Sequence, residues 1–387
     1  MRLFQGKPLF PSLQELHWYI QPPVSAGIIF VVTSALRRLT VCYGGDGGNS
    51  RTWRYTQQKL FRTIFDAAPK LTYLAVNDTH PAIIPACLSS IQVLDELRVL
   101  SLDNAACISS DVLSTLSRLE RLEELTFAVK PKEGSLVDFR GFPRLKTLDM
   151  SVLNGSTRSI ICRFSSPELR KLTLLTPENV VDPDEFLHIA TELSKSFPSM
   201  EQLSWTFSYP SAAPFEVAPP LETALAPLLP LRMTSVSLVF DEPIPDALSD
   251  ETFHVIAKSW PRLVYLRITD GFGDTPRPFE TNVTWRSLIT LAQGCTQLEQ
   301  LYLGKMKVLG LEQELRDCPV LQHPLQELIV DWPGIPIEEE SACALLLDRL
   351  FPSLDAPPLR GHESETGWDR VLQSVWLCRA GRSNRAS

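Results

Sequence analysis

The sequence predicts an α/β solenoid, in which short parallel strands line one side and helices return along the other. Three observations carry this prediction. A short apolar phrase recurs twelve times, its second half alternates in the manner of a half-buried strand, and amphipathic helical patterns separate several copies. Because each unit of such an array contacts only its neighbours, all 387 residues can form one array without a single large core.

The repeated phrase consists of an apolar residue, two variable residues, a leucine, one variable residue and a further apolar residue, often with a proline two positions ahead. The copies begin at Leu13, Leu36, Leu71, Leu97, Leu122, Leu145, Leu169, Met200, Met233, Leu263, Leu298 and Leu325, and a degenerate copy begins at Leu354. Successive copies start 23 to 35 residues apart, and many of these spacings match leucine-rich repeats of about 20–29 residues. We therefore expect a leucine-rich-repeat horseshoe with strands on the concave face and helices on the convex face.

Helical patterns lie between several copies. Residues 51–68 place a stripe of large apolar residues on one helical face, and Asp182-Pro183 is a typical helix start, with a capping side chain and a proline in the first turn. Further helices are expected from Ser249 and from Asn282, the latter ending at Gly294. These helices supply the return path of the later repeats.

The repeats continue to the end of the chain, so residues 1–387 are predicted to form a single solenoid of about 12 irregular repeats. Residues 208–230 contain six prolines and are interpreted as a loop insertion with one short helix at Leu221–Ala226. Residues 355–387 are expected to be a C-terminal capping segment and tail. Its helix would cover the last repeat with Trp368, Val371, Leu372, Val375 and Trp376.

Composition argues against several classes of partner. The formal net charge is −8, whereas nucleic-acid binding needs a concentrated basic field. The longest apolar stretch, Val24 to Leu36, is too short to cross a bilayer, and the first residues do not form a signal peptide. The eight cysteines are scattered without a C-x-x-C pair, which favours reduced thiols in a cytoplasmic or nuclear protein.

The sequence contains no recognised catalytic motif. The glycine-rich stretch Gly44–Gly48 lacks the Gly-Lys-Ser/Thr ending of a phosphate-binding loop and is interpreted as a surface loop. The six histidines are dispersed, with no H-x-x-x-H or H-E-x-x-H pair for a metal. We expect no catalytic residue, cofactor or metal; an enzyme with an unrecognised site is the less favoured alternative.

The variable residues of each strand are expected to face solvent together, because the leucines beside them point inward. A protein ligand is therefore predicted on the concave face. The candidate contact residues are His17, Tyr19, Arg38, Tyr73, Asp103, Lys171, Tyr265, Arg267 and Tyr302. Tyr265, Arg267 and Tyr302 occupy consecutive repeats and form the preferred anchor, since tyrosine and arginine dominate interface hot spots. Ala75 and Thr269 are assigned to the same outward set.

The F-P-x-L-x-x-L units and the ending Leu345–Leu354, followed by Trp368 and a closing helix to Arg379, resemble the repeat region of fungal, basidiomycete-type F-box proteins. The resemblance implies the substrate-recognition part of an SCF-type ubiquitin ligase. The first repeat begins at Leu13 and no F-box is visible, so a Skp-type adaptor is expected only if an F-box lies upstream. A repeat-only binding or regulatory protein without a ligase link is the alternative.

Overall fold

A computed structural model describes residues 9–20, 26–43, 51–77, 88, 90–102, 107–130, 141–153, 157–180, 183–208, 220–240, 248–270, 282–308, 310–311, 315–316, 318–355 and 367–386. The chain divides into two compact units. The first comprises Met1–Asn179 and Glu192–Met200, and the second comprises Val180–Thr191 and Glu201–Ser387. Each unit is built from successive strand-and-helix repeats.

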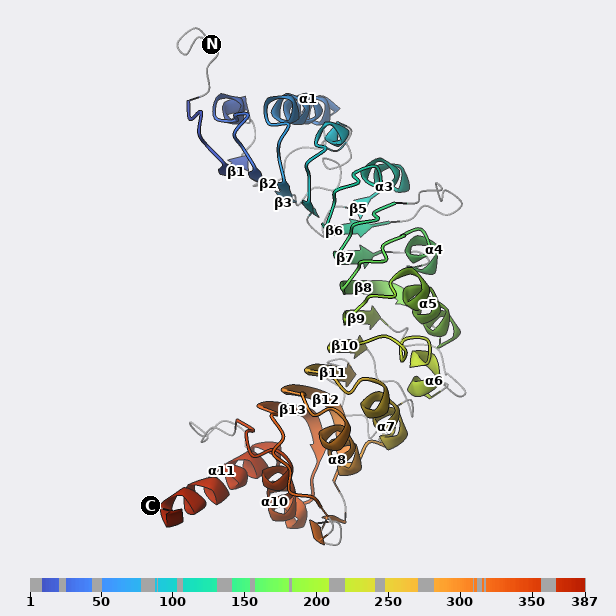
Figure 1. Ribbon diagram of the computed structural model, residues 1–387, viewed down its shortest axis with the longest axis vertical. Coiled ribbons are helices and arrows are strands. Elements are labelled where there is room, and N and C mark those ends of the chain that lie inside the picture. The colour runs from blue at the N-terminus through green and yellow to red at the C-terminus, as the bar shows by residue number, and fades with distance from the viewer. Residues whose placement is uncertain are drawn as a thin grey trace. The chain divides into compact units, whose positions relative to one another are not determined.

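The first unit contains a parallel sheet in the order β1-β2-β3-β4-β6-β7-β8, with β5 paired to β6 outside this order. Its strands are β1 Glu15–Ile20, β2 Arg38–Tyr43, β3 Tyr73–Asn77, β4 Val99–Leu102, β5 Cys107–Ile108, β6 Glu124–Val129, β7 Thr147–Val152 and β8 Lys171–Val180. The returns are the 3-10 helices η1 Ala26–Phe30 and η2 Ile91–Val93 and the α-helices α1 Arg51–Ala67, α3 Ser110–Leu116 and α4 Thr157–Ile161. These helices lie on one side of the strands (Figure 1).

The second unit contains a parallel sheet in the order β9-β10-β11-β12-β13. Its strands are β9 Gln202–Ser208, β10 Ser235–Phe240, β11 Tyr265–Asp270, β12 Gln300–Lys307 and β13 Glu327–Gly334. Its helices are α6 Leu221–Leu225, α7 Asp250–Ser259, α8 Trp285–Gly294, η3 Ile337–Glu339, α10 Glu340–Leu350 and α11 Gly367–Ala386, while α5 Pro183–Ser196 contributes residues to both units. Parallel strands with helical returns confirm the predicted α/β leucine-rich-repeat fold.

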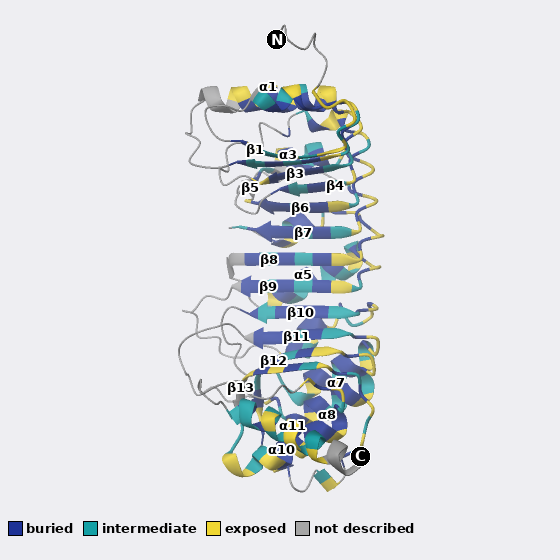
Figure 2. Ribbon diagram, turned by 90° about the vertical axis from the view of Figure 1, so that its left-hand side faces the viewer, coloured by how far each residue is buried: buried dark blue, intermediate teal, exposed yellow. Residues whose placement is uncertain are grey.

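The core consists of the repeated leucines in lateral register. Leu125, Leu148 and Leu172 are consecutive partners across β6, β7 and β8, and each is at most 1% exposed. In the second unit, larger rings take inward positions: Trp205 stacks on Phe186 with ring centroids 4.6 Å apart. Figure 2 shows the strands of each unit side by side with buried and partly exposed residues in alternation, as the period-2 pattern of the phrase predicts.

A backbone ladder precedes the strands and holds the repeats in register. The residue before most strands donates its N–H to the carbonyl of the equivalent residue one repeat earlier, as in Arg98 to Thr72 at 2.9 Å and Glu123 to Arg98 at 2.7 Å. The same bond joins Asp355 to Gln326 at 2.7 Å. The degenerate copy that begins at Leu354 therefore keeps the backbone hydrogen bond that joins the other repeats.

Most expected helices are present where the sequence placed them, with some differences in detail. The helix expected from Asn282 begins at Trp285, because Thr284 caps it by accepting a hydrogen bond from the N–H of Arg286 at 3.2 Å. The short helix inside residues 208–230 is α6, whereas residues 209–219 and the glycine stretch at 44–48 lie outside the described residues.

Ala75 and Thr269 correct the expected outward set. Ala75 is 4% exposed and Thr269 is 5% exposed, so neither presents a surface to a partner. Short outward residues on other strands, such as Thr40 and Thr126, are partly exposed. An outward strand position therefore does not by itself make a residue accessible to a partner.

His323 is a buried polar group of the second unit, 3% exposed. Its Nδ1 lies 3.2 Å from the N–H of Leu325, which donates to it, so its Nε2 carries the hydrogen and donates to the carbonyl of Cys295 at 2.9 Å. The neutral ring thus joins two repeats. Burial lowers the pKa of His323 below its ordinary value, because a charged ring would be poorly solvated there.

This arrangement predicts that acidification destabilises the second unit through His323. The unfolded chain binds a proton near the ordinary histidine pKa of about 6.5, while the folded chain resists protonation. The contribution of His323 is therefore present above about pH 6.5 and is lost as the pH falls toward its lowered folded value. Denaturant unfolding between pH 7.5 and 5 should show a shallower pH dependence for His323→Gln than for the wild type.

The matched control is His254→Gln, since His254 is exposed on α7 of the same unit. That variant should retain the wild-type dependence on pH. Equal slopes for wild type and His323→Gln would contradict the assignment of a neutral, hydrogen-bonded His323.

Candidate protein-binding surface

The register of the first unit aligns its outward residues into rows that cross the strands. The first row consists of Glu15, Arg38, Tyr73, Val99, Glu124, Thr147 and Lys171, and the second of His17, Thr40, Ala75, Ser101, Thr126, Asp149 and Thr173. The second row is formed largely by short side chains, whereas the first carries both signs of charge. The outward face of this sheet is therefore polar.

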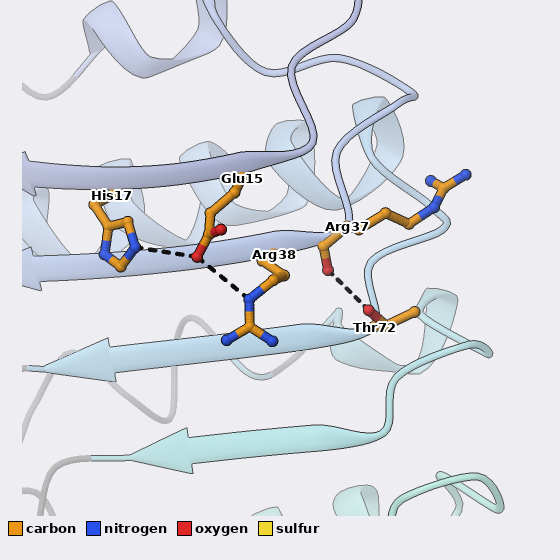
Figure 3. A network of polar contacts seen from close by, with 5 residues as sticks. All are labelled: Glu15, His17, Arg37, Arg38 and Thr72. Atoms are coloured by element: carbon orange, nitrogen blue, oxygen red, sulfur yellow. Dashed lines mark hydrogen bonds and ion pairs between the residues drawn. The ribbon is translucent and has the colours of Figure 1, made fainter.

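One cluster on this face joins the first three strands. Glu15 Oε1 lies 3.3 Å from both Arg38 Nε and His17 Nε2 (Figure 3). The Arg38 guanidinium carbon lies 4.0 Å from the centre of the Tyr73 ring, which is a cation–π contact. These side chains are largely exposed, and exposed ion pairs contribute at most about 1 kcal/mol to stability. These polar groups are therefore accessible to a partner and contribute little to the stability of the fold.

A second cluster lies within the second unit, on β11, β12 and β13. Its members are Tyr265, Arg267, Gln300, Tyr302, Glu327 and Ile329. The strand register pairs Arg267 with Tyr302 and Tyr302 with Ile329. The two tyrosine rings lie 5.5 Å apart at an angle of 42°, and the Arg267 guanidinium carbon is 6.0 Å from the Tyr302 ring centre. We call this group the second-unit cluster.

The polar groups of the second-unit cluster differ in how well they are satisfied. Gln300 Nε2 donates to Glu327 Oε2 at 3.0 Å. Burial raises the pKa of Tyr302 to about 12, with the neighbouring Glu327 carboxylate adding to the increase, so the Tyr302 hydroxyl stays protonated at any physiological pH. In contrast, the buried Nε of Arg267 has no hydrogen-bond partner within the described ranges.

The candidate contact residues fall into these two clusters and a remainder. His17, Arg38 and Tyr73 lie together in the first unit, and Tyr265, Arg267 and Tyr302 lie together in the second, as the repeat register predicts. Tyr19 is 65% exposed on β1. Lys171 is exposed on β8 and pairs with Thr147, in neither cluster. Asp103 lies outside the described residues.

Glu327 and Ile329 were missed as candidates. They occupy the same two strand positions in the twelfth repeat as Tyr265 and Arg267 occupy in the tenth. Extending the register by two repeats would have placed them in the cluster. Ile329 is 39% exposed, which is unusual for a large aliphatic side chain, and it makes the edge of the cluster apolar.

The described ranges also bear on three other classes of site: metal sites, membrane spans and reactive cysteines. Within these ranges no group of three histidine, cysteine or acidic side chains is arranged to hold a metal. Among the described helices, none combines the length and apolar character needed to cross a membrane. Burial raises the pKa of the Cys295 and Cys343 thiols to about 12, so both are protonated and poorly nucleophilic.

Similarity to known proteins assigns no family to this chain. No protein-family model matches the chain, and no curated protein matches it. A crystal structure of a Rad7 and Elc1 complex in yeast matches with a TM-score of 0.45 and 14% sequence identity, over 84% of this chain and 76% of that one. A likeness this distant assigns neither a partner nor an activity to the present chain.

Proposed function

We propose that the chain is a protein-recognition scaffold, whose partner binds the outward face of the strands with the second-unit cluster as its anchor. The observation that carries the proposal is the grouping of Tyr265, Arg267 and Tyr302 on adjacent strands. Large, partly buried tyrosine and arginine side chains dominate the energetics of protein interfaces. Leucine-rich repeats serve many functions, so the proposal rests on this surface and not on the fold.

The test is a binding measurement with the triple variant Tyr265→Ala/Arg267→Ala/Tyr302→Ala. A partner is first captured with the wild-type chain and purified, and its Kd is then measured by calorimetry. Loss of one hot-spot residue costs about 2 kcal/mol or more, so the triple variant should bind at least about 30-fold more weakly. Circular dichroism would verify that the variant is folded.

The matched control is Lys195→Ala on α5, because Lys195 is 65% exposed and makes only an i,i+3 pair with Glu192 at 3.4 Å. This variant should bind as the wild type does. A folded triple variant that binds with unchanged affinity, together with weakened binding by Lys195→Ala, would place the partner on the helical side and refute the proposal.

The narrower form of the proposal is a substrate receptor of an SCF-type ubiquitin ligase in the cytoplasm or nucleus. It is supported by the resemblance of the F-P-x-L repeats and of the C-terminal segment to fungal F-box proteins. Co-purification of the Skp-type adaptor with a chain extended by any upstream F-box would support it. Partner binding without adaptor association would favour the alternative, a repeat-only regulator that acts by occupying its partner.

A further inference from the structure

Arg267 carries a donor that the described part of the chain leaves unpaired. Its Nε atom is buried and has no hydrogen-bond partner among the described residues, and Arg267 lies on the outward face, between the strand positions of Ser237 and Tyr302. A buried donor without an acceptor is costly, and for a charged group the cost is larger. The side chain as a whole is only partly buried, so its terminal Nη atoms, and not the buried Nε, can take an acceptor that arrives from outside.

Glu327, the acid of the second-unit cluster, does not supply that acceptor. Glu327 accepts from Gln300 at 3.0 Å, and over the described ranges no carboxylate oxygen lies within the 4.0 Å ion-pair distance of the Arg267 guanidinium. The Arg267 guanidinium carbon instead lies 6.0 Å from the centre of the Tyr302 ring. A planar guanidinium beside aromatic rings is a suitable receptor for a carboxylate, which it can bind through two parallel hydrogen bonds.

The surroundings of Arg267 argue against a polyanionic partner. Two sets of residues form one edge of this surface, called the acidic edge below. The first set directly precedes the strands of the second unit or occupies the equivalent position of the last repeat: Glu201, Thr234, Val264, Glu299, Gln326 and Asp355. The second set is the first outward residue of each strand: Gln202, Ser235, Tyr265, Gln300 and Glu327. Four of these are acidic and none is lysine or arginine. A phosphate backbone or a run of acids would extend along this edge and be repelled by its carboxylates. A single carboxylate that contacts Arg267, at the next outward position of the strand, need not lie along the edge.

We propose that the occupant of the second-unit cluster is a peptide segment of a partner protein that presents one aspartate or glutamate to Arg267, next to an aromatic or aliphatic side chain packed on Tyr302 and Ile329. This inference rests on the proposed function and specifies its partner. The apolar neighbour follows from the exposed Ile329 and the two tyrosine rings. Residues of the segment that reach the acidic edge are neutral or basic.

The experiment uses a phage library of random dodecapeptides selected on the wild-type chain and depleted on the triple alanine variant. Synthetic copies of the selected peptides are then measured by fluorescence polarisation. We expect a single Asp or Glu beside an apolar residue. Replacing that acid by its amide, or Arg267 by methionine, should each weaken binding about 10- to 100-fold, since hydrogen bonds to charged groups are strong.

A double-mutant cycle makes the pairing specific. The affinity of the amide peptide for Arg267→Met should be about as low as that produced by either single change alone. The two losses should not add, because both changes remove the same contact. Lys258→Met on α7 is the matched control, as it removes one positive charge from an exposed helical position of the same unit, and it should leave the affinity unchanged. Poly-L-glutamate is the polyanion probe and should not compete with the selected peptides.

Stability supplies a readout that does not depend on any peptide. Because Arg267 Nε lacks an acceptor in the free chain, Arg267→Met should unfold at the same or a higher temperature than the wild type. A marked decrease in Tm would show that Arg267 has an internal structural role and would overturn the inference.

The failure of this inference is distinguishable from that of the proposed function. Peptides that need Tyr265 and Tyr302 but carry no acid, or competition by poly-L-glutamate through Arg267, would overturn the inference and leave the scaffold function supported. A selection in which every peptide retained by the wild type is removed by depletion on the triple variant would count against both.

Discussion

Replacing Leu148 by alanine is expected to lower the free energy of unfolding by about 2–5 kcal/mol, the range for truncating a fully buried leucine. Leu148 is 0% exposed, is the second residue of β7, and lies between Leu125 of β6 and Leu172 of β8 in the strand register. Truncation leaves a cavity in the row between these two leucines. Leu125→Ala should have a comparable effect, since Leu125 is 1% exposed at the equivalent position.

Urea unfolding followed by circular dichroism measures this effect, and the adjacent Thr147→Ala is the matched control. Thr147 is the outward neighbour of Leu148 on the same strand and is only partly buried. Its truncation should change stability by about 0.5 kcal/mol or less. Equal losses for the two variants would show that the inward and outward positions of β7 are assigned to the wrong faces.

Deleting the residues after Pro358, which removes α11, should produce aggregation and a lower melting temperature. Terminal repeats of a solenoid expose apolar faces unless another element covers them. α11 packs against α10 and β13, and it buries Trp368, Val371 and Val375 to 6%, 0% and 0% exposure. Leu372 is only partly buried and Trp376 is 39% exposed, so the covering face is narrower than the five residues predicted from the helical pattern.

Polar contacts hold this helix in place as well. Arg370 Nη2 lies 2.6 Å from Glu340 Oε1. Arg379 lies 3.2 Å from Asp348 Oδ1, donates to the carbonyl of Phe351 at 2.7 Å, and also donates to that of Leu354. Asp348 is 6% exposed, and removing a partner of a buried carboxylate is strongly destabilising. Arg379→Met should therefore lower stability without shortening the chain.

Size-exclusion chromatography with light scattering, combined with thermal unfolding, tests the role of α11. The control is Trp376→Ala, which changes an exposed residue of the same helix and should remain monodisperse with a Tm near that of the wild type. A truncated chain that stays monomeric and melts at the wild-type temperature would show that the last repeat needs no cover.

The repeat phrase by itself determined the fold class, the register and the inward residues. Its leucines recur at fixed positions, and a period of two leaves each strand only one way to place them against a core. Helices with strong amphipathic patterns, such as α5 and α7, could be located for the same reason. The grouping of Tyr265, Arg267 and Tyr302 also followed, because consecutive repeats lie side by side in a parallel sheet.

Only the tertiary structure decided which outward residues are available and which are already satisfied. Ala75 and Thr269 obey the outward period and yet are buried, whereas Thr40 and Thr126 at outward positions of other strands are partly exposed. Glu327 is paired with Gln300, whereas the buried Nε of Arg267 has no acceptor. Hydrogen bonding between strands depends on distances across the sheet that a one-dimensional period does not contain, so the unsatisfied charge of this surface becomes visible only in the folded chain.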